Sequence, residues 1–79
     1  MNMKFFGNES GEATVELYSD REAVISGCKS VLDYTENGIE LNMGDRLLHI
    51  KGEDLVIRTF VFEQIDVSGK IKSLEFFEV

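Results

Sequence analysis

The sequence predicts an all-β protein, a small antiparallel β-sandwich without significant helix. Three observations support this prediction: apolar residues recur at every second position, turn residues separate these segments at short intervals, and no apolar stripe with helical spacing persists. The chain contains no proline, which agrees with paired strands, because proline is tolerated only at the edges and bulges of a sheet.

About seven to eight strands are expected along the chain. They lie near residues 13–18, 22–28, 29–35, 38–43, 46–51, 54–61 and 64–77. The last segment is expected to bend and could form two strands. Asn37-Gly38 is the strongest hairpin signal and predicts a two-residue type I′ turn with positive φ at both positions. Gly44-Asp45 and Gly52-Glu53-Asp54 predict two further turns. Consecutive hairpins therefore predict a meander in the middle of the chain.

One stretch of the sequence occurs twice: ISGCKSVLDY at 25–34 returns without a gap as VSGKIKSLEF at 67–76. In each copy the apolar residues keep one parity up to a point beyond the glycine and then change to the other. Because a one-residue slip exchanges the faces of a strand, each copy is expected to contain a bulge or kink that turns both halves toward the core. Strands bent in this way commonly pass between the sheets of a sandwich, so both copies are expected at corners. The alternative is that both faces are simply buried there.

The size and charge of the chain limit its function. Its 79 residues make a single domain, with residues 1–12 expected to form a flexible leader and residues 13–79 the β-sandwich domain. The net charge of −7 disfavours binding to nucleic acid and to anionic membrane surfaces. No apolar segment is long enough to span a bilayer, and the N-terminal apolar stretch is too short for a signal peptide. We therefore expect a soluble, cytoplasmic protein without direct membrane insertion.

No residues stand out with catalytic or metal-binding spacing. His49 has the opposite parity to Leu48 and Ile50 and is expected at the surface, without a recognisable nucleophile, orienting carboxylate or further metal ligands. Cys28 is the only cysteine, which excludes an internal disulfide and fits a small hydrophobic residue better than a reactive thiolate. We therefore expect no catalytic residues, no enzyme activity, no cofactor and no metal. The alternative is a small ligand- or metal-binding β domain that uses the acidic turns.

Three phenylalanines, Phe60, Phe62 and Phe77, are candidates for a contact surface. The runs Phe60-Val61-Phe62 and Phe76-Phe77 place large apolar groups on both faces of a strand, so part of each run is expected to be exposed. The alternative is that these residues fill the core between two sheets. A domain of this size needs additional stabilisation, and with no disulfide available we expect a homodimer or higher homo-oligomer.

Several motifs occur together in a defined order. They are Leu17 and Arg21 ahead of Ile25-Ser26-Gly27, then Ile50-x-Gly52-x-x-Leu55, then Gly69-Lys70-Ile71 with Ser73-Leu74-Glu75-Phe76. In this order and spacing, over residues 17–77, the chain resembles the YabP/YqfC family of sporulation proteins, found in endospore-forming Firmicutes. Each motif alone is ordinary strand and turn chemistry, so the specificity lies in their combination.

The resemblance implies a non-enzymatic role in spore formation during coat or cortex assembly. It places the protein in the cytoplasm of the mother cell or at the forespore surface, with a membrane-embedded sporulation protein as partner and with no catalytic residues to transfer. It also implies an immunoglobulin-like form of the β-sandwich, in agreement with the strand pattern. The function expected from the residues and the resemblance together is that of a protein–protein interaction module.

Overall fold

The computed structural model describes residues 13–78 and contains six strands and no helix in this range. The strands are β1 (Thr14–Tyr18), β2 (Glu22–Ser26), β3 (Ser30–Tyr34), β4 (Gly38–Asn42), β5 (Arg46–Val61) and β6 (Gln64–Glu78). All neighbouring strands are antiparallel and form one sheet in the order β1-β2-β6-β5-β4-β3. Strands β3 to β6 follow one another as hairpins, so the predicted all-β class and the central meander are confirmed.

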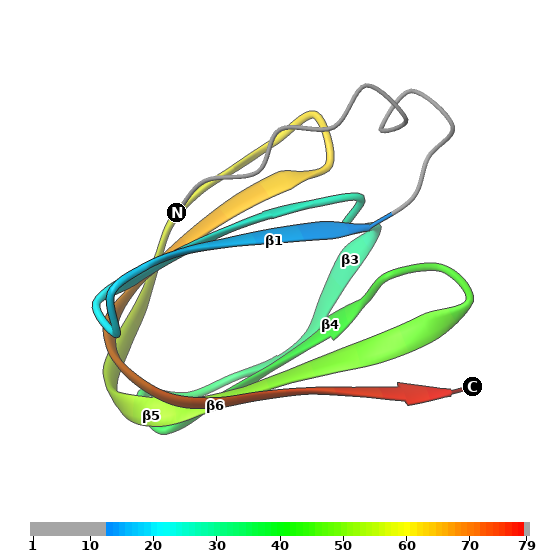
Figure 1. Cartoon of the computed structure of the whole chain (residues 1–79). Helices are drawn as coiled ribbons and strands as arrows, with labels where there is room; N and C mark the ends of the chain where they lie inside the picture. The colour runs from blue at the N-terminus through cyan, green and yellow to red at the C-terminus, as the bar shows by residue number, and fades with distance from the viewer. Residues whose placement is uncertain (1–12, 79) are drawn as a thin grey trace.

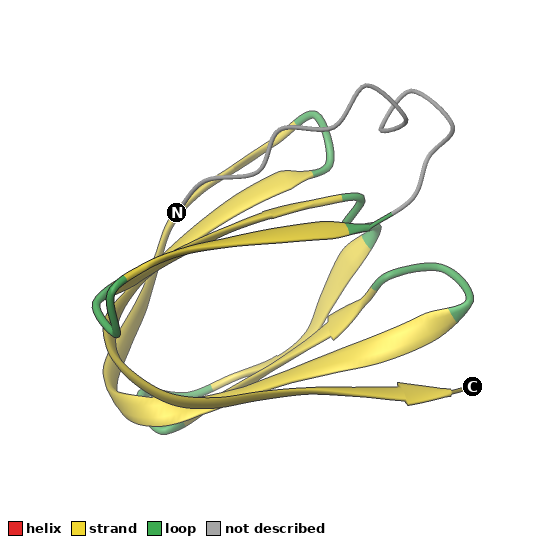
Figure 2. Ribbon diagram, viewed as in Figure 1, coloured by secondary structure: helices red, strands yellow, loops and turns green. Residues whose placement is uncertain are grey.

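The sheet folds into two facing layers because its longest hairpin, β5 with β6, bends in the middle (Figure 1, Figure 2). The β1–β2 layer contains β1, β2, residues 64–68 of β6 and residues 56–61 of β5. The β3–β4 layer contains β3, β4, residues 46–51 of β5 and residues 73–78 of β6. Both layers therefore belong to one continuous hydrogen-bonded sheet, whereas an immunoglobulin-like sandwich has two separate sheets.

The bend of the β5–β6 hairpin lies where the register of its strands shifts. Three shifts occur along β5, and each leaves an extra residue on one strand, which bends and twists the ladder locally. Glycines allow the strands to approach closely here. A β-carbon on Gly52 would overlap the carbonyl oxygen of Lys70, and one on Gly69 would lie 2.5 Å from a carbonyl oxygen of β5. The hairpin bends at this point because both positions lack a side chain.

Turns of the neighbouring hairpins hold this bend from both sides. On the β6 side, the backbone N–H groups of Gly69 and Ile71 donate to carbonyl oxygens of the β1–β2 turn at 3.0 and 2.7 Å. On the β5 side, those of Gly52 and Leu55 donate to carbonyl oxygens of the β3–β4 turn at 3.1 and 2.8 Å. These backbone groups therefore remain paired although the strand ladder is interrupted.

The core lies between the two layers and is almost entirely aliphatic. Its buried members are Ala23, Ile25, Cys28, Ile39, Leu41, Met43, Leu48, Ile50, Leu55, Ile65, Val67 and Ile71. The edge strands β1 and β3 add only partly buried residues such as Val15 and Val31. Each fully buried aliphatic side chain contributes roughly 1.5–3 kcal/mol relative to exposure. The inner strands therefore provide most of the stability, and the edge strands cover the core.

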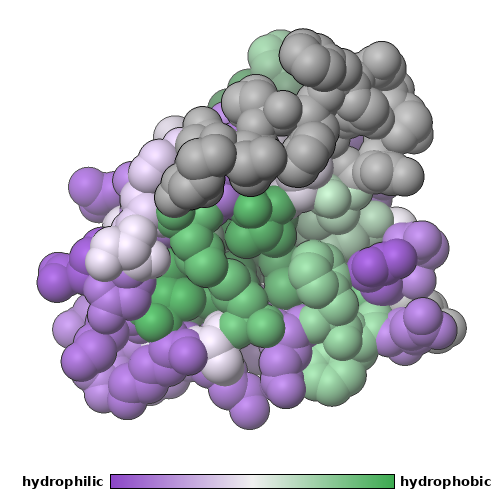
Figure 3. Space-filling model, viewed as in Figure 1, coloured by the Kyte–Doolittle hydropathy of each residue, from purple (hydrophilic) through white to green (hydrophobic). Residues whose placement is uncertain are grey.

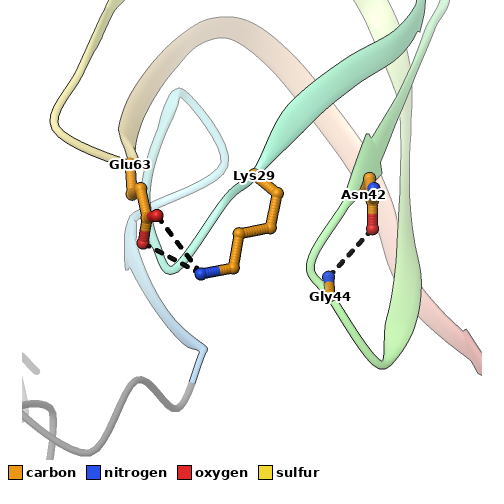
Figure 4. Close-up of polar contacts among 4 residues, drawn as sticks. All are labelled: Lys29, Asn42, Gly44 and Glu63. Carbon is orange, nitrogen blue, oxygen red and sulfur yellow. Dashed lines mark hydrogen bonds and ion pairs between the residues drawn. The ribbon is translucent and has the colours of Figure 1, made fainter.

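The number of strands is six rather than seven to eight, because residues 46–51 and 54–61 form a single strand. The expected turn at Gly52-Glu53-Asp54 is wrong: this segment is a bulge within β5. The other predicted glycine turn is present between β4 and β5. Gly44 has a φ of 102°, and its N–H donates to Asn42 Oδ1 at 2.9 Å (Figure 4).

The β3–β4 hairpin lies where Asn37-Gly38 predicted it, but its turn type is different. Neither residue has a positive φ, and Thr35 Oγ1 instead accepts hydrogen bonds from the N–H groups of Asn37 and Gly38 at 3.2 and 3.0 Å. Two consecutive positive φ values occur at Phe62 and Glu63, in the turn that joins β5 to β6. The geometry of a type I′ turn is thus found at a position where the sequence does not indicate it.

Both copies of the near-repeat contain the register slip that their parity predicted. In the first copy the slip lies between Val31 and Asp33 in β3, and in the second Lys72 is the extra residue on β6. These are the points at which the apolar parity changes in the sequence. The period of two therefore locates bulges as well as strands.

The two copies nevertheless form different structures. The second is one bent strand that continues from layer to layer, whereas the first leaves β2 and crosses through the loop 27–29 before β3 begins. The second half of each copy faces the core side, because Tyr34 pairs with the buried Ile39 and Phe76 with the buried Leu48. Both side chains are only partly covered, at 47% and 46% exposed, because each lies on the edge strand of its layer. Leu32, the extra residue of the bulge, is 52% exposed.

Candidate interaction surfaces

Phe62 has the most exposed large apolar side chain among residues 13–78, with 97% of its surface accessible. It lies in the two-residue turn between β5 and β6, where Phe62 and Glu63 have φ values of 54° and 63°. This left-handed region favours glycine and asparagine, and a bulky residue in it costs on the order of 1 kcal/mol or more. Neither packing nor backbone geometry therefore accounts for a phenylalanine at this position.

The turn that carries Phe62 is fixed to the loop between β2 and β3. The carbonyl oxygen of Glu63 accepts hydrogen bonds from the N–H groups of Gly27 and Cys28 at 2.9 and 3.0 Å. Lys29 Nζ lies 3.2 Å from both carboxylate oxygens of Glu63 (Figure 4). This exposed ion pair contributes only about 0–1 kcal/mol, so the two backbone bonds are the main restraint. Phe62 is therefore presented on a turn whose orientation is defined by a second segment.

The structure brings Phe60 and Phe62 together at the hairpin tip and places Phe77 elsewhere. Phe60 pairs with Ile65 and therefore faces the rim of the space between the layers. Phe77 lies at the other end of β6, pairs with Leu47 and faces away from the core. Of the three candidate residues, Phe62 is the one whose side chain is almost fully free for a contact.

Phe77 belongs to a cluster on the outer face of the β3–β4 layer. Its ring packs edge-on against His49, with the ring centroids 4.9 Å apart. His49 Nε2 in turn lies 3.0 Å from Glu40 Oε2, on the outward face that its parity predicted. These intramolecular contacts account for both Phe77 and His49, so neither residue requires a partner molecule to explain its position.

A group of acidic residues lies on the outer face of the β1–β2 layer. Glu16, Glu22 and Asp66 come from β1, β2 and β6, and the strand register places all three on this face. Within residues 13–78, no lysine or arginine forms an ion pair with any of them. Asp66 Oδ1 is buried and has no hydrogen-bond partner in the same range. Among the described residues, only Arg58 offsets this charge, by partly opposing the rise in the pKa of Glu22, so the acidic face keeps an excess of negative charge.

Two pKa shifts show the effect of this charge. The pKa of Glu22 is raised, chiefly because its carboxyl group hydrogen-bonds with Asp66 and then because of the negative charge of Asp66. The pKa of Tyr18 is raised mainly by the charge of Glu16. Both directions are those expected where negative groups lie close together, and a cation placed on this face would reverse them.

Strand β1 and the second half of β6 lie at facing edges of the two layers (Figure 1). Between them lies an apolar groove, a pocket of about 320 Å³ with Leu17, Ile71 and Leu74 as its apolar lining. Its polar lining residues are Ser19, Asp20, Lys72 and Ser73. Figure 3 shows apolar side chains gathered on this side of the molecule. A strand edge, an acidic face and an apolar groove therefore lie next to one another.

The acidic face could not be predicted from the sequence, because β2 and β6, which bring its members together, are distant in the chain. A weaker signal was present. Glu16 alternates with Val15 and Leu17, and Asp66 alternates with Ile65 and Val67, so both carboxylates had to point outward. What the sequence lacks is the pairing register that makes them neighbours.

Side chains suited to metal binding or covalent chemistry are few in the described part of the chain. No three histidine, cysteine, aspartate or glutamate residues between 13 and 78 are grouped closely enough to hold a metal ion. Cys28 is buried, its Sγ donates to the carbonyl oxygen of Ser30 at 3.5 Å, and burial raises the pKa of the thiol. Cys28 is therefore a core residue, and the alternative of metal binding at the acidic turns gains no support from these residues.

Two further expectations concern an N-terminal leader and the lack of a membrane-spanning segment. The expected leader, residues 1–12, lies outside the described residues. Between residues 13 and 78, no helix is long and apolar enough to span a bilayer.

Comparison with known proteins identifies the family. A model of the YabP family matches residues 9–79, a range that contains all six strands and the motifs at 17–77. Comparisons with curated proteins and with solved structures gave no match. The match covers nearly the whole chain, so the chain belongs to the YabP family and is associated with sporulation.

Proposed function

We propose that this member of the YabP family is a non-enzymatic interaction module that acts in the mother cell during assembly of the spore coat or cortex. Family membership supports the role in sporulation. The observation that supports the interaction role is Phe62, an almost fully exposed aromatic side chain on a restrained turn.

Burial of Phe62 in a partner would supply the interaction with a central apolar anchor. A phenylalanine side chain transferred from water to an apolar pocket contributes roughly 1.5–3 kcal/mol. Buried aromatic anchors of this kind dominate the energetics of many interfaces. Because the turn is already held by Gly27 and Cys28, little conformational entropy is lost on binding. Phe62 thus has the exposure and the restraint that a contact residue needs.

We take the partner to be a membrane-embedded sporulation protein, in line with the family resemblance. The net charge of −7 disfavours direct contact of the domain with anionic lipid. The aromatic side chain therefore enters an apolar pocket of that protein rather than the bilayer. The partner holds the domain at the forespore surface in this proposal.

Affinity capture from sporulating cells tests the proposal. The full chain carrying Phe62→Asn is compared with the wild type and with Leu32→Asn, a matched control because Leu32 is also exposed but lies on β3. We expect one membrane protein to dominate the wild-type and Leu32→Asn eluates and to be absent from the Phe62→Asn eluate. Equal recovery with all three chains would remove Phe62 from the interface.

Self-association is the second part of the proposal, because a domain of this size gains stability from a homodimer. Light scattering on the purified chain measures the oligomer, and Phe62→Asp and Phe77→Asp each place a charge in a candidate contact. A monomer at all concentrations contradicts the homodimer, and an unchanged dimer in both variants places the dimer contact elsewhere.

A further inference from the structure

Strand β1 has a free edge on the side of the apolar groove. It is the first strand of the sheet, and between residues 13 and 78 it pairs only with β2. The backbone N–H and C=O groups of its other edge are therefore available to an added strand. Val15 and Leu17 point toward the core side of this strand, and Glu16 points to the outer face.

The groove beside this edge matches the inward side of an added strand. Its floor and far wall include Leu17, Ile71 and Leu74. Phe76 lies on the same face of β6, because it pairs with the buried Leu48. Its ring is 46% exposed, and the Arg46 guanidinium lies over it, 5.6 Å from the ring centroid. Every second residue of an added strand would lie over these apolar side chains. Those positions of a bound segment must therefore be apolar.

The outer face of β1 determines which residue types fit at the outward positions of an added strand. A residue that pairs across from Glu16 lies next to Glu16 on the acidic face, whereas Glu22 and Asp66 lie one and two strands further into the sheet. Glu16 has no ion-pair partner among residues 13–78. Opposite charges directly across a strand pair are stabilising, and like charges are destabilising. The outward residue of a bound segment that lies opposite Glu16 is therefore expected to be lysine or arginine.

We propose that the free edge of β1 binds an extended segment of a partner protein that has apolar residues at alternate positions and a lysine or arginine opposite Glu16. The segment adds to the β1–β2 layer as a further antiparallel or parallel strand and closes the groove toward β6. This inference rests on the proposed function as an interaction module, and it adds the edge used and the chemistry of the partner.

Charge argues against a second copy of this chain as the occupant. A copy added at β1 would bring its own acidic residues to the acidic face, and each chain carries a net charge of −7. The opposite opening of the molecule is less accessible, because the Tyr34 hydroxyl there bridges the layers through the Ile57 N–H at 2.9 Å. The β1 side is therefore the open side that a basic strand fits.

The test uses two synthetic heptapeptides, Lys-Val-Lys-Val-Lys-Val-Lys and its counterpart with glutamate in place of lysine. Amide hydrogen exchange of the full chain is followed by NMR with and without each peptide. We expect the lysine peptide to slow hydrogen exchange of those amides between Thr14 and Tyr18 that point away from β2, toward the free edge. The expected slowing is about tenfold or more at saturation. The glutamate peptide is expected to leave them unchanged.

Charge-reversal variants localise the effect. Glu16→Lys removes the carboxylate that would lie opposite a peptide lysine. It is expected to weaken binding of the lysine peptide by about tenfold and to favour the glutamate peptide. Glu36→Lys makes the same change of net charge on the distant β3–β4 turn and is expected to bind like the wild type. If both variants lose the lysine peptide equally, net charge rather than the β1 edge governs binding and the proposal is wrong.

Other outcomes also overturn the proposal. It is wrong if neither peptide protects β1, if both do so equally, or if the protected amides lie on β3 or β5. Protection of β1 without peptide that disappears on dilution would identify a second copy as the occupant, and protection that persists on dilution would identify the chain's own residues. Phe62→Asn is expected to leave peptide binding unchanged, so failure at β1 can be distinguished from failure of the proposed function.

Discussion

The hydroxyl oxygen of Tyr34 accepts a hydrogen bond from the backbone N–H of Ile57 at 2.9 Å, although the two residues lie in different layers. Tyr34 is on the edge strand β3, and Ile57 is next to a register shift of β5. The bond therefore connects the layers on the side opposite the groove. A half-exposed tyrosine on an edge strand thus has a structural function that its exposure alone does not suggest.

Replacement of Tyr34 by phenylalanine should reduce stability by about 1 kcal/mol, because the Ile57 N–H loses its acceptor while the ring remains. Tyr18→Phe is the matched control, since that hydroxyl bonds an exposed Glu16 carboxylate at 3.3 Å and its loss should be close to neutral. Urea unfolding of both variants measures the difference. Equal midpoints for the two variants would show that the bond between the layers does not contribute.

The bend of the β5–β6 hairpin should not tolerate a side chain at Gly52. Gly52→Ala would place its β-carbon against the Lys70 carbonyl oxygen and is expected to cost about 2–4 kcal/mol, enough to unfold a marginal domain. Gly44→Ala should cost only about 1 kcal/mol, because φ is positive but the β-carbon would make only an ordinary contact, 3.7 Å from a side-chain carbon of Lys29. Gly38→Ala, with no atom closer than 3.9 Å, should be the mildest change. Thermal unfolding should rank the variants in this order, and a stable Gly52→Ala chain would contradict the close approach.

Phe62→Asn should stabilise the isolated domain by about 0.5–1 kcal/mol, because asparagine accepts the left-handed φ of 54° and no packing is lost. Phe60→Asn is the control at the same tip. It should destabilise the domain, because Phe60 covers the rim of the core opposite Ile65. Denaturant unfolding distinguishes the two. A gain in stability with a loss of partner capture would separate function from folding at Phe62, whereas a loss of stability would assign Phe62 a structural role.

Glu22 should make the domain less stable as pH rises. Its pKa is raised in the folded state above the ordinary value of 4.5, so its contribution to stability is complete below about 4.5 and is lost as pH rises through the folded pKa. Glu22→Gln is therefore expected to be more stable than the wild type at pH 7 and to remove this part of the pH dependence. Urea midpoints between pH 4 and pH 8 provide the measurement.

Glu53→Gln is a control of opposite sign for Glu22. Lys72 Nζ bonds the Glu53 carboxylate at 2.7 Å and lowers its pKa below the ordinary 4.5. Its contribution is therefore present above pH 4.5 and is lost as pH falls through the folded pKa. Glu53→Gln should thus be less stable than the wild type at pH 7, and the same sign of change in both variants would contradict the assignment.

The local features of the fold could be predicted from the sequence, and the long-range ones could not. The period of two located the strands, and its parity changes located the bulges at Leu32 and Lys72. The type I′ turn was placed at Asn37-Gly38 because the residues favour it there, yet Phe62 and Glu63 adopt the positive φ values. A position where the local rule fails in this way is where functional constraint is expected.

The candidate surfaces show the same division. Phe62 was identified because a strand end with apolar residues on both faces leaves one of them exposed. Glu16 and Asp66 were not linked, because their proximity depends on the pairing of β2 with β6, which no local pattern encodes. The single sheet was also missed, since parity cannot tell whether two facing layers are joined through one bent hairpin.

The shared hairpin also determines the order in which the surfaces form. Four of the five strand pairings join segments that are adjacent in the chain, and only the pairing of β2 with β6 closes a long loop. Loop closure delays such contacts, so we expect β3 to β6 to assemble first and β2 to join later. Because β1 and β2 form a local hairpin, the groove between β1 and β6 is completed only when β2 pairs with β6. A newly made chain would then acquire the complete binding site, edge and groove together, only after the rest of the domain has folded.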